Sequence, residues 1–337
     1  MKKVFSFFGS LILFVITTSS QAQSKEAGWK IIHTKNIITD RGECGMAAAD
    51  GKLYLLGGTG QSPVEVFAPV TSAWTKKALA PVEMHHFQPV TYKNNIYVLA
   101  AFSGGTGYPN QYNLKNVHIY NIAKDEWTLG APLPANRNRA AAGAALYKGK
   151  IYLVAGIKNG HNNGTTNFFD VYDPQTDQWS ALPDAPHIRD HCAAAVIGDN
   201  LYIAGGRNTS YHEPENFRAF FSHTILEVDC YDFEKGEWTT LDARLPLGTG
   251  GGSMVNFNDE LYYMGGERAT DTEANQPRKN VYRLNPANGN GWTPMPDLLV
   301  PRNGMSAAVL PDHIYVFGGA GSIVFNSAAP LEVFTTK

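Results

Sequence analysis

Short apolar strands recur along the chain, each bounded by small or polar residues. Each begins with Leu or Ile followed by Tyr, and a pair of Gly or Ala residues comes four positions after the aliphatic residue. The segments start at Leu53, Ile96, Ile151, Leu201, Leu261 and Ile314. Self-similarity at a period of about 50 residues is typical of propellers and other repeat architectures. The pattern predicts six repeated β units.

Tryptophans mark a later strand in the same units. Phe67 precedes Trp74 by seven positions, and an aromatic residue precedes Trp127, Trp179 and Trp238 at the same spacing. Trp29 stands before the first unit, whereas the last unit ends at residues 331–334 without a Trp strand. An open ring would leave bare strand edges, which promote aggregation. We therefore predict that the strand around Trp29 pairs with residues 331–334 and closes the ring.

This pattern resembles the kelch repeat, and the resemblance covers residues 23–337. It implies an all-β fold, a single six-bladed β-propeller with four-stranded blades. The segments expected to form the inner strands, such as 140–146 and 192–198, are rich in Ala. Small side chains suit strands that converge on a narrow axis.

The N-terminal residues 1–22 have the features of a signal peptide. Lys2 and Lys3 precede an apolar run over residues 4–16, and small residues lead to Ala22. This predicts cleavage near Ala22 and a secreted or periplasmic protein. We expect no membrane insertion, because a bilayer span needs about 20 apolar residues.

The composition limits the kinds of molecule that we expect the protein to bind. The formal net charge is -2 and charges form no long runs of one sign, which argues against nucleic acid as a partner. The three cysteines cannot all pair, so stability must come from a packed core. We expect a monomer that binds a carbohydrate or an extracellular protein.

A residue triplet ten to twelve positions before each Leu/Ile-Tyr pair falls in the loop that enters the inner strand. We expect these loops to surround one mouth of the channel. The first position is Arg in four units, which predicts a scaffold role through charge-assisted hydrogen bonds for Arg41, Arg139, Arg189 and Arg302. The third position varies, with Glu43, His86, Ala141, His191, Gly251 and Gly304. The repeat does not require this variation, so it favours a functional site.

His86 and His191 are the candidate catalytic residues. A histidine that titrates near neutrality beside arginine can act as a general acid or base. The alternative is a partly exposed histidine that hydrogen-bonds a loop carbonyl. Long loops after the small pair in the fourth and fifth units add further candidates, because such loops often carry function. The predicted ligand-binding residues are Glu43, His85, Arg139, Asp190, Arg207, Tyr211, Glu267, Arg268 and Asn303.

We predict no metal and no cofactor. The two candidate histidines come from different units, and no local cluster has the spacing typical of zinc sites. His85 and His86 are adjacent, and adjacent side chains in extended backbone point apart.

Kelch propellers are known as enzymes and as binding modules, so the fold alone decides little. Galactose-oxidase-like members have seven blades and bind copper through two Tyr and two His, with one Tyr linked to Cys. The six units found here, with no cysteine beside a suitable tyrosine, argue against that chemistry.

Exported six-bladed kelch proteins include sialic acid epimerases (mutarotases), and this resemblance implies anomeric proton transfer. His86 or His191 would be the base, with Arg207 and Arg139 as an anion clamp. The same groups suit β-elimination of a uronic acid. We predict that the mouth binds an acidic carbohydrate, and the sequence leaves open whether it also processes the sugar in one of these ways. The alternative is a non-catalytic module that binds a glycan or a protein.

Overall fold

The computed structural model describes Met1 and residues 27–36, 38–216, 222–269, 275–289, 291–320 and 330–336. Apart from Met1, the predicted signal peptide lies outside the described residues, as do residues 217–221 and 270–274 of the two long loops.

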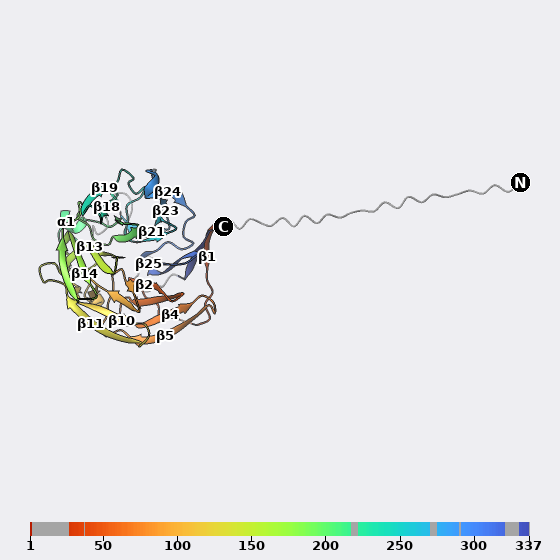
Figure 1. Ribbon diagram of the computed structural model, residues 1–337, viewed down its shortest axis with the longest axis horizontal. Coiled ribbons are helices and arrows are strands. Elements are labelled where there is room, and N and C mark those ends of the chain that lie inside the picture. Colours follow the sequence, from red (N-terminus) through yellow and green to blue (C-terminus); the bar gives the residue numbers. More distant parts are fainter. Residues whose placement is uncertain are drawn as a thin grey trace.

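Six antiparallel sheets are arranged around a central axis, as predicted (Figure 1). Blade 1 contains β2 (Cys44–Ala49), β3 (Lys52–Gly57), β4 (Pro63–Ala68) and β5 (Ala73–Leu79). Blade 2 contains β6 (Val90–Tyr92), β7 (Asn95–Val98), β10 (Asn116–Asn121) and β11 (Glu126–Pro132). Blade 3 contains β12 (Gly143–Tyr147), β13 (Lys150–Asn159), β14 (Asn163–Asp173) and β15 (Gln178–Leu182).

The remaining blades follow the same order from the axis outward. Blade 4 contains β16 (Ala193–Ile197), β17 (Asn200–Ala204), β18 (Asp229–Asp232) and β19 (Glu237–Thr240). Blade 5 contains β20 (Gly250–Phe257), β21 (Glu260–Arg268), β23 (Val281–Leu284) and β24 (Thr293–Met295). Blade 6 contains β25 (Asn303–Leu310), β26 (His313–Ala320), β27 (Glu332–Thr335) and, from the other end of the chain, β1 (Gly28–Ile31).

Blade 6 therefore joins the two ends of the described propeller. β1 pairs antiparallel with β27, and Trp29 lies opposite Phe334 with ring centroids 5.2 Å apart. The Trp29 indole also donates a hydrogen bond to the carbonyl of Pro296, which follows β24, at 2.9 Å. One residue thus connects the N-terminal strand both to the C-terminal strand and to the neighbouring blade.

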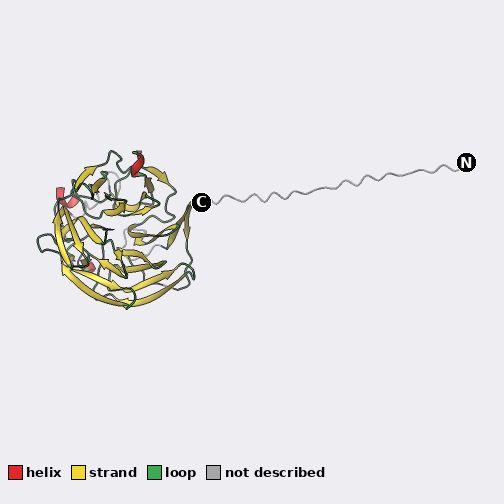
Figure 2. Cartoon of the chain, viewed as in Figure 1, coloured by secondary structure: helices red, strands yellow, loops and turns green. Residues whose placement is uncertain are grey.

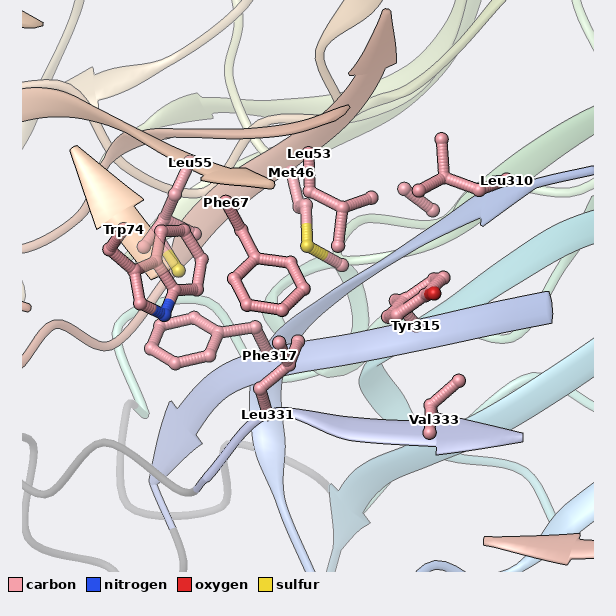
Figure 3. Packing of buried hydrophobic residues seen from close by; sticks show 12 residues of the cluster. Met46, Leu53, Leu55, Phe67, Trp74, Leu310, Tyr315, Phe317, Leu331 and Val333 are labelled. Carbon is pink, nitrogen blue, oxygen red and sulfur yellow. The ribbon is translucent and has the colours of Figure 1, made fainter. Parts of the chain in front are cut away.

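Aromatic pairs fill the spaces between blades. Phe67 and Trp74 face each other across β4 and β5, with ring centroids 5.1 Å apart. Trp74 also lies 5.5 Å from Phe317 of blade 6, so the pair packs against the neighbouring sheet (Figure 3). The Tyr–Trp pairs of blades 2, 3 and 4 repeat the first contact at 5.1–5.3 Å. The seven-residue spacing in the sequence is the spacing of this cross-strand pair.

The small pair is needed because the backbone turns tightly where the second strand ends. Its first residue has a positive φ in all six blades, between 51° at Ala100 and 72° at Gly318. A Cβ at Gly265 would overlap the sulfur of Met305 in the next blade. Glycine removes both the strain and the overlap.

Short elements lie in the connections within the blades, and the helical ones are red in Figure 2. β8 (Phe102–Ser103) pairs with β9 (Tyr112–Asn113), β22 (Gln276–Pro277) pairs with β21, and α1 (Thr209–His212) follows β17. The 3-10 turns are η1 (Gly105–Gly107) and η3 (Pro286–Asn288). Within the described ranges, no helix has the length and apolar character needed to cross a membrane.

Candidate functional site at the axial mouth

The loops that enter the inner strands meet at one end of the axis, which we call the axial mouth. The third residue of each triplet has a left-handed backbone, with φ values from 52° to 67°, and these residues are Glu43, His86, Ala141, His191, Gly251 and Gly304. Five backbone hydrogen bonds of 2.8–3.1 Å join these positions from blade to blade, for example from the His86 amide to the Glu43 carbonyl. The ring of bonds offsets the strain of placing non-glycine residues in this conformation.

The four repeated arginines lie behind this ring as scaffold. Each is fully buried and pairs with a carboxylate on the third strand of its own blade: Arg41 with Glu65, Arg139 with Asp170, Arg189 with Asp229, and Arg302 with Glu332. Each also donates to the carbonyl of the first residue of the small pair. The bonds therefore lock the loop onto its own blade.

Arg139 does not fit its predicted part in an anion clamp. Its donors are bonded to four backbone carbonyls and to Asp170 at 2.7 Å, and its exposed fraction is 0%. A guanidinium so fully used within one blade has no donor to offer a ligand. We therefore remove Arg139 from the candidate site.

Three histidines from three blades gather at the axial mouth. The ring centroids of His86, His161 and His191 lie 5.0–5.1 Å from one another. Nε2 of His161 is 3.2 Å from Nε2 of His191. The prediction for the pair His86 and His191 placed them at one mouth, and the structure brings them into direct contact. The histidines have no characteristic spacing in the sequence, so the sequence did not show which of them meet.

His161 is the site residue that sequence reasoning missed. It lies in the connection between β13 and β14, five residues after the small pair of blade 3. Only the long loops of blades 4 and 5 were singled out, although the segment GIKNGHNNG occupies the corresponding position in blade 3. A histidine within this Asn- and Gly-rich loop was the available signal.

Asp190 orients this group from behind. Its Oδ1 lies 2.5 Å from Nδ1 of His191 and 3.0 Å from Nε of Arg207, while Oδ2 accepts from the Thr165 hydroxyl at 2.6 Å. Burial raises the pKa of Asp190, but Arg207 and His191 outweigh it and hold the pKa below its usual value. The carboxylate is therefore ionised and fixes His191 with Nδ1 as the protonated nitrogen.

His85 and His86 turn toward each other, so the expectation that they point apart is wrong. Their Nδ1 atoms lie 2.5 Å apart, because the left-handed backbone at His86 breaks the alternation of extended chain. His85 is 1% exposed, and burial lowers its pKa to about 4. It packs against Phe102, with ring centroids 5.9 Å apart, and is not among the residues that line the axial cavity.

Glu43 of blade 1 and Glu267 of blade 5 add acidic groups to the axial mouth. Glu43 Oε2 lies 3.4 Å from Nε2 of His86. Burial, together with the charge of Glu267, raises the pKa of Glu43 to about 8. Glu267 is 7% exposed and accepts from Asn275 at 2.6 Å, and Asn303 is also buried. Glu267 and Asn303 thus lie in the same polar group as Glu43.

For two further predicted residues, Tyr211 and Arg268, no contact between the described residues joins them to this group. Tyr211 is 56% exposed on α1, and its ring contacts His212. Arg268 is the half-buried last residue of β21.

An axial cavity of about 70 Å³ adjoins the ring of third positions. All six third positions line it, together with the next one or two residues of each blade. Gln88 also lines it and reaches across to blades 3 and 4, accepting from the amides of Ala144 and Ala194 at 3.2 and 3.0 Å. Beyond the ring of third positions, its lining mixes polar residues such as Ser253 and Ser306 with Ala and Cys side chains.

The fold and this axial arrangement define a six-bladed β-propeller with a polar site at one mouth. A family model described as the KLHDC2/KLHL20/DRC7 Kelch-repeats domain matches residues 46–266, more than half of the chain. The chain belongs to the kelch-repeat family.

Relatives include Kelch-like protein terF of Aspergillus terreus, 27% identical over 82% of this chain and 57% of that protein. Human Kelch-like protein 23 is 28% identical over 79% of this chain and 43% of that protein. Beta-scruin of Limulus polyphemus is 28% identical over 64% of this chain and 23% of that protein. The matched regions thus span less than two thirds of these relatives.

A solved structure, titled "Structure of YjhT", has the same fold. It aligns with a TM-score of 0.73 and 16% identity, covering 89% of this chain and 96% of that one. At this identity the likeness concerns the fold.

Proposed function

We propose that this propeller binds an acidic carbohydrate at the axial mouth. The observation that carries the proposal is the convergence of Arg207, Asn303 and the three histidines on one end of the axis. A repeat scaffold needs none of these residue types at these positions. Amide, imidazole and guanidinium groups are the donors that a sugar carboxylate and its hydroxyls require.

The dimensions of the axial cavity suggest how such a ligand would enter. About 70 Å³ accommodates a carboxylate group but is well below the roughly 300 Å³ of a typical ligand pocket. In the proposed complex the carboxylate end occupies the cavity beside His86 and His191, and the sugar ring lies outward in the axial mouth.

Proton transfer on the bound sugar is the second candidate function. Asp190 lies 2.5 Å from Nδ1 of His191, which leaves Nε2 directed toward His161. A carboxylate that orients an imidazole is the arrangement found for general bases. Epimerisation at an acidic sugar and β-elimination of a uronic acid both need such a base. Export through the predicted signal peptide would place this chemistry in the periplasm or outside the cell.

A non-catalytic role in binding a glycan or a partner protein is the alternative. Tyr211 supports it, because a tyrosine that is 56% exposed offers an aromatic surface of the kind enriched in interfaces. This surface lies on α1 rather than among the mouth histidines.

Calorimetric titration with N-acetylneuraminate, galacturonate and their methyl esters tests the proposal. We expect at least one free acid to bind at least tenfold more tightly than its ester, and Asn303→Ala to weaken that binding. Tyr211→Ala is the matched control and should bind normally. Equal affinity for acid and ester, or no binding of either, would refute the proposal. Loss of binding in Tyr211→Ala alone would favour the alternative, and proton exchange followed by NMR separates turnover from binding.

A further inference from the structure

The three mouth histidines form a nearly equilateral cluster whose ring nitrogens converge. One ligand atom from each of His86, His161 and His191 lies within 4.8 Å of the other two. We propose that these three imidazoles bind a divalent transition-metal ion, with Zn²⁺ as the best match. The proposal goes beyond carbohydrate binding and does not depend on it.

For His161 and His191, the hydrogen bonds behind the cluster are those of metal-bound histidines, whereas Nδ1 of His86 faces Nδ1 of His85. Nδ1 of His161 lies 2.9 Å from Oε1 of Gln111, and Nδ1 of His191 lies 2.5 Å from Oδ1 of Asp190. Both partners are oxygen acceptors, so each Nδ1 carries the proton and each Nε2 presents a lone pair. Metal-bound histidines almost always donate their second nitrogen in this way, which fixes the ring and its tautomer.

The spacing of the two lone pairs fits one ion. Nε2 of His161 and Nε2 of His191 lie 3.2 Å apart. Two nitrogens bound to a tetrahedral zinc at about 2.0 Å lie roughly 3.3 Å apart. Two lone pairs that face each other repel, whereas a cation that both coordinate turns the same geometry into an attraction.

The ligand set itself fits a transition-metal ion. All three ligands are imidazoles, and His161 and His191 are buried. Imidazole nitrogens suit Zn²⁺ rather than Mg²⁺ or Ca²⁺, which prefer oxygen. Three histidines leave a fourth coordination position for water or another ligand, as in catalytic zinc sites.

Metal binding also bears on the second candidate function. An Nε2 atom that coordinates an ion cannot accept a proton. In the metal-bound protein, His191 would therefore be a ligand and not the general base.

Calorimetric titration of chelator-treated, tag-free full-length protein with Zn²⁺ tests the inference. We expect one ion per chain, at least a 100-fold loss of affinity in His161→Ala, and a 10- to 100-fold loss in Gln111→Leu, which alters only the hydrogen bond behind His161. Circular dichroism checks that each variant folds. If His161→Ala does not fold, Gln111→Leu still tests the inference. Co²⁺ absorption should show a four-coordinate site.

The control variant is His212→Ala/His223→Ala. These two histidines form a separate pair with ring centroids 5.0 Å apart, and His223 lies 2.9 Å from Glu213. The control should bind Zn²⁺ as the wild type does. No zinc binding by the wild type, unchanged binding in folded His161→Ala, or loss confined to the control variant would overturn the inference. Because no saccharide is present, these outcomes do not depend on the proposed function.

Discussion

Oδ1 of Asp190 lies 3.0 Å from Nε of Arg207, and both side chains are almost wholly buried. Asp190→Ala would leave the guanidinium buried without its carboxylate, which typically costs about 3–5 kcal/mol of unfolding free energy. Asp232→Ala is the control, because its partner Lys235 is 71% exposed and such pairs contribute at most about 1 kcal/mol. Urea unfolding measures both. Equal losses in the two variants would contradict the buried ion pair.

The scaffold arginines should affect stability and not ligand affinity. Arg302→Met leaves buried Glu332 without its cation, and we expect a loss of about 3–5 kcal/mol. Arg139→Met should cost less, because Arg137 still pairs with Asp170 at 2.6 Å. Folded Arg139→Met should bind ligand as the wild type does. A stable Arg139→Met variant that has lost ligand binding would restore its predicted place in the clamp.

Gly251 and Gly304, two of the third positions at the axial mouth, make a matched pair for substitution. Gly251→Ala should cost about 1–2 kcal/mol, the strain of a left-handed alanine, which Ala141 already tolerates at φ 52°. Gly304→Ala should cost more, because the new Cβ would overlap the Glu43 carboxylate. The double variant Glu43→Ala/Gly304→Ala should regain the difference. Thermal unfolding of the three variants measures these losses of stability. If the double variant recovered no stability, the Glu43 carboxylate would not lie against Gly304.

Trp29→Ala tests how the ring closes. It removes the contact with Phe334 and the hydrogen bond to Pro296, and buried Trp→Ala changes cost about 3–5 kcal/mol. Lys30→Ala on the same strand changes an exposed side chain and should have little effect. If denaturant unfolding of Trp29→Ala matched that of Lys30→Ala, β1 would not be an integral strand of blade 6.

Glu83, two residues before His85, gives a pH-dependent prediction. Burial raises its pKa, but hydrogen bonds from the amides of Gly60, Gly104 and Gly105, together with the charge of His85, outweigh it and hold the pKa below its usual value. A carboxylate with a depressed folded pKa stabilises the protein above its unfolded pKa, and this stabilisation is lost as the pH falls through the folded pKa. Glu83→Gln should therefore be less stable than the wild type at pH 7 and approach it below pH 4. A difference that is constant with pH would contradict this.

The fold could be predicted because its signals are local and repeated six times. The Leu/Ile-Tyr pair marks the second strand, and the Phe67–Trp74 spacing marks a cross-strand contact. Blade 2 lacks the glycine pair, yet Ala100 adopts the same left-handed backbone at φ 51°. The blade therefore imposes this left-handed backbone whether the residue is Gly or Ala, and glycine only lowers its strain.

The site was predicted only in part, because its contacts join residues far apart in the chain. Aligning the repeats identified His86 and His191, which occupy one column. His161 comes from a loop whose path the repeat pattern does not give. The sequence also cannot show that the donors of Arg139 are all used within its own blade. The left-handed backbone at His86, which turns it toward His85, is likewise invisible in the sequence.

Imidazoles from three neighbouring blades meet at one point of the axial mouth. A crystal structure of the zinc-soaked protein, with anomalous data collected at the zinc edge, would show whether they bind one ion. The account predicts one strong peak about 2.0–2.1 Å from a nitrogen of each of His86, His161 and His191. A peak at His212 and His223 instead, or mouth rings that point away from one another, would contradict it.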